Sequence, residues 1–171
     1  MHVLVATDGQ LDAAAVAKFS APLAGSDGTV TVLTVIEVPR AMLQELQDHF
    51  SDQQPPKLHM VDSETVSTGA AEAPRSWPGD DAIIHQYLDN KRDQICSPLV
   101  AALRETGVTT TSRVVEGQAD RGILNTAEEL NVDVIVIGAH GSGFFEGLLG
   151  STGAKVTRLA KRPVLLLRNS Q

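Results

Sequence analysis

The sequence predicts an α/β protein: a single doubly wound parallel sheet of five strands with helices on both faces, a Rossmann-like architecture. The first reason is the order of the patterns, because short apolar runs alternate with helical stretches along the chain. The second is that these runs are continuously apolar, as expected of strands buried on both faces. The 171 residues suit one domain, 1–171, interrupted by an irregular proline-rich insert at about 40–79.

The five expected strands are rich in Val, Leu, Ile and Thr, which fit a pleated, buried surface. Turn residues or prolines bound several of them, among them Gly9, Pro39 and Pro163. The strands are expected over residues 2–6, 29–36, 109–115, 132–137 and 164–167.

The first helical pattern follows the first strand. Leu11, Ala15, Phe19 and Leu23 recur every four residues, which predicts that they form the buried stripe of a helix. Gly25 is the expected stop, because glycine accepts the backbone conformation that ends helices.

The other three helices are placed by caps and helix breakers. Acidic residues are expected to cap the second and third, and a proline to bend the second. Lys155 and Arg158 are expected on a solvated face of the last helix. The predicted caps are Asp80 or Asp81 and then Asp120, the bend is at Pro98, and the last helix runs from about Thr152 to Arg162.

The insert at 40–79 differs in composition from the rest of the chain, with several prolines among many Ser, Glu and Ala residues. An irregular segment of this length is usually either a functional lid or disordered. Composition favours disorder for residues 51–76. The position of the insert, directly after the second strand, favours a lid, and both interpretations stay open.

The totals exclude some classes of function. A net charge of −7 argues against non-specific nucleic-acid binding, which needs a basic surface. The lone cysteine, Cys96, cannot form an internal disulfide and is expected to pack as a small hydrophobic side chain. No signal peptide or membrane span is recognised, so no membrane partner is expected and a cytoplasmic location is favoured.

A glycine-rich loop connects the fourth strand to the last helix. The apolar run 134–137 leads into Gly138-Ala139-His140-Gly141, and Gly150-Ser151-Thr152 opens the helix. Free N–H groups and the positive end of a helix dipole favour an anion at such a place. If the first and fourth strands are neighbours, Asp8 faces this loop across the crevice where strand order reverses.

These pieces together resemble the universal stress protein family over nearly the whole chain apart from the insert. The matching segments are Ala6-Thr7-Asp8, residues 33–37, residues 134–141, and Leu149-Gly150-Ser151 with residues 160–166. The resemblance implies a five-stranded sheet of order 3-2-1-4-5, of the adenine nucleotide alpha hydrolase-like type. It also implies a homodimer, here through the last strand, Val164–Leu167.

ATP-binding members of that family carry a glycine motif, which assigns cofactor-binding roles by resemblance. Gly138 and Gly141 would line the phosphates and ribose, and the backbone of Val35 would meet the adenine edge. Ser151 is also compatible with a plain helix cap. The implied set is Ala6, Thr7, Asp8, Val35, Gly138, Gly141, Gly150, Ser151 and Thr152, with Asp8 on the ribose or on Mg²⁺ carried by the ATP.

Three functions remain open at this point. The first is an ATP-binding, dimeric stress-response regulator with at most slow ATP hydrolysis and no catalytic residue assigned. The second is a nucleotide-free dimeric interaction module of the same fold, because eight residues separate Gly141 from Gly150 where the family motif has nine. The third is a nucleotide hydrolase or phosphotransferase that uses Asp8 and His140.

Overall fold

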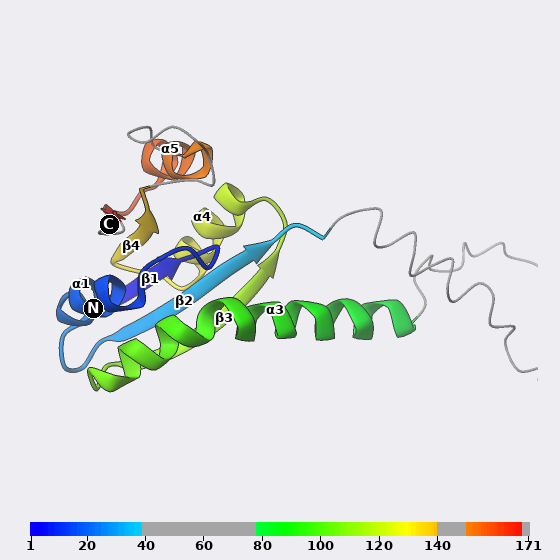
Figure 1. Cartoon of the computed structure of the whole chain (residues 1–171). Coiled ribbons are helices and arrows are strands. Elements are labelled where there is room, and N and C mark those ends of the chain that lie inside the picture. Colours follow the sequence, from blue (N-terminus) through cyan, green and yellow to red (C-terminus); the bar gives the residue numbers. More distant parts are fainter. Residues whose placement is uncertain (39–77, 140–149, 169–171) are drawn as a thin grey trace, which may run out of the picture. The chain divides into compact units, whose positions relative to one another are not determined.

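A computed structural model describes residues 1–38, 78–139 and 150–168 (Figure 1). By packing, the chain divides into two compact units, Met1–Glu37 with Tyr87–Gln171, and Val38–Gln86. The first unit contains the whole sheet. Most of the second unit, with the predicted lid, lies outside the described residues. The assignment of sheet and insert to one domain therefore stays a prediction.

The first unit is built on a five-stranded parallel sheet of order β3-β2-β1-β4-β5, which confirms the predicted fold class. β1 is the central strand and pairs with β2 on one side and β4 on the other. The outer pairs are β2 with β3 and β4 with β5. The strands span His2–Ala6, Thr29–Ile36, Thr109–Glu116, Val134–Gly138 and Val164–Leu167 in chain order.

Helices cover both faces of the sheet. On one face lie α1 and the part of α3 that belongs to the first unit, and on the other lie α4 and α5 (Figure 1). Alternate strand residues face opposite sides. Val3 and Val5 of β1 therefore pack with α1 and α3, whereas Leu4 and Ala6 pack with α4 and α5. The helices span Ala13–Ala24 (α1), Pro78–Glu105 (α3), Ala119–Glu129 (α4) and Ser151–Leu159 (α5).

The predicted stripe of α1 is wrong. Phe19 is 47% exposed and Leu23 is 37% exposed, while Val16, Ser20 and other small residues face the sheet. Leu11 is buried, as predicted, but it precedes the helix. Because this helix is alanine-rich on every side, spacing alone does not distinguish its buried face.

The predicted caps also need correction. α3 begins at Pro78, before either proposed aspartate, and continues through Pro98 as one helix. α4 is capped by Gln118, so Asp120 lies in its first turn. The last helix is shorter than predicted, Ser151–Leu159. Within the described residues, no helix is long and apolar enough to cross a membrane.

Candidate functional site

The candidate site lies at the carboxyl edge of the sheet, between β1 and β4. The two strands are direct neighbours, with Ala6 level with Ile137. The chain leaves β1 toward β2 and leaves β4 toward β5, in opposite directions. The condition set by the sequence is therefore met, because Asp8 follows β1 and Gly138 ends the adjacent strand β4 at the point where strand order reverses.

A tight turn fixes the residues after β1. The Thr7 hydroxyl accepts the Gly9 N–H at 2.9 Å, and the Asp8 carboxylate accepts the Gln10 N–H at 3.1 Å. Gly9 has a φ of +94°, which favours glycine. Asp8 is exposed and does not cap α1, because Asp12 holds that position. The turn thus uses one carboxylate oxygen of Asp8, and the second oxygen can accept from a ligand.

The end of β2 presents a backbone donor and acceptor at the same edge of the sheet. In a strand, successive residues direct their N–H and C=O groups to alternate neighbours. The Leu33 carbonyl accepts from Thr7 on the β1 side at 2.9 Å, and the Ile36 carbonyl accepts from Gly117 on the β3 side at 3.0 Å. Val35 therefore faces the β1 side, past the end of that strand, with no partner there among the described residues.

The amino terminus of α5 is open. Gly150 is the N-cap, with no side-chain hydrogen bond, and no acidic residue occupies the first turn. The first helical bond joins Ala154 N–H to the Gly150 carbonyl at 2.8 Å, so the N–H groups of the three preceding residues have no partner within the described part of the chain. Ser151 is thus the first helical residue rather than the cap. Ser151 is exposed and Thr152 is partly exposed.

The glycine loop is only partly described. Gly138 is the last residue of β4, level with Leu167 of β5, and the Ala139 N–H donates to the Leu167 carbonyl at 2.7 Å. Gly141 and His140, and with them the shortened loop, lie outside the described residues. The structure thus brings together the ends of β1, β2 and β4 at one edge, where α5 also begins.

Beside this edge an ion pair joins the middle of α5 to the first turn of α4, a contact that no local sequence pattern indicates. Lys155 Nζ of α5 lies 3.5 Å from Asp120 Oδ2 in the first turn of α4. Lys155 is exposed, as predicted for a solvated helix face, and the ion pair is an addition to that prediction. Arg158 is exposed, as expected.

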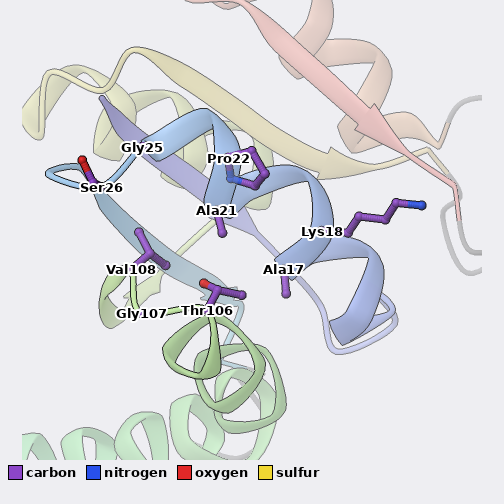
Figure 2. Close-up of a pocket in the computed structure, with 9 residues that line it drawn as sticks. All are labelled: Ala17, Lys18, Ala21, Pro22, Gly25, Ser26, Thr106, Gly107 and Val108. Atoms are coloured by element: carbon purple, nitrogen blue, oxygen red, sulfur yellow. The ribbon is translucent and has the colours of Figure 1, made fainter.

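A separate hollow of about 600 Å³ lies at the opposite, amino edge of the sheet (Figure 2). It is formed by the end of α1 and the segment that leads into β3. Figure 2 shows Lys18 pointing away from the hollow, which leaves small apolar side chains such as Ala17, Ala21 and Val108 along it. Because β2 and β3 begin here, this hollow is remote from the crevice that the sequence predicts.

Neither a reactive thiol nor a metal site built from several side chains is indicated among the described residues. Cys96 is 1% exposed and packs in the core, and burial raises its pKa to about 11, so the thiol stays protonated near neutral pH. Among the described residues no three His, Cys, Asp or Glu side chains group as a metal site. A metal ion at Asp8 would need most of its ligands from elsewhere, such as phosphate oxygens.

Sequence comparison assigns the chain to a family. The model of the universal stress protein family matches residues 1–168. The chain is 42% identical to universal stress protein YxiE of Bacillus subtilis over 65 residues, which cover 37% of this chain and 44% of that protein. It is 33% identical to universal stress protein Rv2623 of Mycobacterium tuberculosis over 97 residues, 55% of this chain and 31% of that protein.

The matches thus span less than half the length of these curated relatives. The family match, by contrast, covers almost the entire sequence. The chain therefore belongs to the universal stress protein family, as the motifs predict.

Solved structures of the same family share the fold. A universal stress protein from Archaeoglobus fulgidus in complex with dAMP superposes with a TM-score of 0.53, at 19% identity over 97% of this chain and 96% of that one. A family protein from Arabidopsis thaliana with AMP bound gives a TM-score of 0.57, at 15% identity over 99% and 92%. A universal stress protein in complex with cAMP gives 0.53, at 22% identity over 99% and 98%.

Proposed function

We propose that this protein binds ATP at the carboxyl edge of its sheet and acts as a dimeric stress-response regulator in the cytoplasm, with at most slow hydrolysis. The single observation that carries the proposal is the open amino terminus of α5, with its glycine cap and unpartnered N–H groups. That arrangement suits phosphate oxygens. In a protein of net charge −7, such local dipoles rather than a general positive field must attract the phosphates.

The base would sit against Val35. The Watson–Crick edge of adenine carries an amino donor beside a ring-nitrogen acceptor, which complements a backbone C=O and N–H on one residue. Guanine presents the reverse pattern, so the same backbone would discriminate against it. The complexes of related proteins with AMP, dAMP and cAMP support the choice of an adenine nucleotide.

The ribose and phosphates would take the remaining groups. Asp8 has a carboxylate oxygen to accept ribose hydroxyls or to approach Mg²⁺ brought by the nucleotide. Ser151 and Thr152 would add hydroxyl donors to the α5 backbone. Gly138, at the end of β4 next to Ala6 of β1 and to Thr7 just after it, would allow close approach of the ligand. Gly141 completes the proposed set.

Thermal unfolding with and without MgATP tests this function. ATP at about 100 times its dissociation constant should stabilise the fold by ~2.7 kcal/mol, and MgGTP should have a much smaller effect. An unchanged melting temperature in millimolar MgATP would favour the second candidate, a nucleotide-free dimeric module. That candidate draws its support from the eight-residue spacing between Gly141 and Gly150.

The proposed dimer uses the free edge of β5. Leu167 directs its carbonyl toward β4, so Leu166 directs its N–H and C=O outward, where an edge strand can pair with a second copy. The side chain of Leu166 is 37% exposed. Leu166→Pro removes the outward N–H and should convert a dimer to a monomer in light scattering. A Leu166→Pro protein that remains dimeric would exclude this edge as the interface.

A further inference from the structure

The side chain of Val35 packs against a glycine of α4. Val35 lies on the sheet face that α4 and α5 cover, and Gly122 is buried opposite it. A Cβ placed on Gly122 would lie 2.8 Å from both Cγ1 and Cγ2 of Val35, and 3.4 Å from its Cβ. The first two distances are well inside van der Waals contact. The backbone of α4 therefore approaches β2 closely only because residue 122 has no side chain.

Rotation of the valine does not relieve this conflict. A β-branched side chain places its two methyl groups in two of three staggered positions. Both positions that Val35 now fills are 2.8 Å from the added Cβ. Every rotamer therefore keeps at least one methyl in conflict, and a side chain on Gly122 must move either α4 or the end of β2.

The segment between β3 and α4 also holds the next residue of β2, Ile36, through its backbone. The Gly117 N–H donates to the Ile36 carbonyl at 3.0 Å, and the φ of Gly117 is +131°, which favours glycine. The Gly122 N–H then makes the first helical bond, to the Gln118 carbonyl at 2.8 Å. The start of α4 thus fixes the end of β2 at two successive residues, and one of them is the residue whose backbone faces the crevice.

We infer that Gly122 is a positioning residue for the base subsite. By admitting the Val35 side chain against α4, it sets the position of the Val35 N–H and C=O that would bind the adenine edge. This inference rests on the proposed function, since it concerns how the same site recognises its base. Gly122 meets the Val35 side chain, which projects from the face of the sheet, whereas the Val35 N–H and C=O lie in the plane of the sheet and point to the β1 side. Its proposed effect therefore passes through Val35 and not through contact with the ligand.

Exchange of side-chain volume between the two positions tests the inference. The variants are Gly122→Ala, Val35→Ala and the double variant, each titrated with a fluorescent ATP analogue and then competed with ATP, GTP and inorganic tripolyphosphate. Gly122→Ala should weaken ATP at least about tenfold, because a tenfold loss needs only a small misplacement of a paired hydrogen bond. Tripolyphosphate, which has no base, should compete equally well against Gly122→Ala and the wild type.

The double variant provides the rescue. Alanine at position 35 has no Cγ atoms, and the remaining Cβ distance of 3.4 Å is ordinary contact. The double variant should therefore recover at least about fivefold of the lost ATP affinity, as expected of coupled neighbours. Wild-type ATP affinity in Gly122→Ala, an equal loss for tripolyphosphate, or no recovery in the double variant would each overturn the inference and leave the proposed function standing.

Two controls separate the remaining outcomes. A wild-type protein that does not bind ATP would overturn the proposed function, and the inference with it. If Gly122→Ala does not fold by circular dichroism, the double variant is compared with Val35→Ala instead. The double variant, with its added methyl, should then bind ATP more tightly than Val35→Ala and bind tripolyphosphate equally well. An ATP affinity equal to that of Val35→Ala would overturn the inference.

Discussion

The two edges of the sheet differ in whether their polar groups are hydrogen-bonded. At the amino edge, the His2 ring and the Thr31 hydroxyl lie 2.9 Å apart, and Thr31 continues to the Thr111 hydroxyl at 3.1 Å. The His2 N–H donates to Asp133 at 2.7 Å. At the carboxyl edge, the Val35 backbone and the first turn of α5 have no partner among the described residues.

β2 carries this difference within one strand. Thr31 is 4% exposed and its hydroxyl is hydrogen-bonded, whereas Thr34, 1% exposed, has a hydroxyl with no partner within the described residues. Ser20 of α1 is another buried hydroxyl in that condition. An unsatisfied buried polar group costs about 1–3 kcal/mol. Within β2, the buried hydroxyl near the start of the strand is therefore hydrogen-bonded, whereas the one near its end has no partner among the described residues.

A charged side-chain cap on the amino terminus of α5 should have the largest effect, on ATP affinity. Gly150 has φ −56° and ψ 155°, an extended conformation that aspartate adopts readily as an N-cap. In Gly150→Asp, the carboxylate would occupy the N–H groups and repel phosphate, and two like charges about 4 Å apart near a surface cost ~4 kcal/mol. ATP affinity should fall about 100-fold or more in calorimetric titrations, while stability changes by only a few tenths of a kcal/mol.

α1 supplies the control for that experiment, because it begins at the same edge with its own cap. Asp12 accepts the Ala15 N–H at 2.7 Å. Asp12→Ala should lower the free energy of unfolding by about 1 kcal/mol and leave ATP affinity within twofold. Equal losses of ATP affinity in Asp12→Ala and Gly150→Asp would mean that the two helix termini do not differ in function.

Breaking the amino edge should have the next largest effect. Thr31→Val removes the buried hydroxyl that links the His2 ring to Thr111, so both partners lose that hydrogen bond. The free energy of unfolding should fall by about 1 kcal/mol in urea denaturation. ATP affinity should not change, because the altered residue lies at the edge remote from the crevice. A Thr31→Val protein as stable as the wild type would show that this chain of hydroxyls adds nothing.

The fold could be predicted from sequence because parallel strands are locally recognisable. Runs such as residues 2–6 and 134–137 are continuously apolar, and only burial on both faces explains that pattern. The buried face of α1 could not be predicted. Its two polar residues are Lys18 and Ser20, and the second is buried, so no polar stripe marks the solvent side.

The candidate site could be predicted only as far as its motifs extend. Asp8, Gly138 and Gly150 lie at the ends of recognisable elements, and the strand order then brings the first two to one edge. Gly122 could not be found in this way. A glycine inside a helical pattern signals only lower helix propensity. Its close approach to Val35 depends on how α4 packs on β2, and no local pattern records that contact.

The smallest expected effect is a gain in the free energy of unfolding rather than a loss. Thr34→Val keeps the shape of the side chain and removes a buried hydroxyl that has no partner among the described residues. The free energy of unfolding should therefore rise by about 1 kcal/mol, measured by the same urea denaturation as for Thr31→Val. Opposite signs at two buried threonines of one strand would establish that the edges differ in hydrogen bonding and not in packing. A loss of stability in Thr34→Val would instead reveal a partner for its hydroxyl, such as an ordered water.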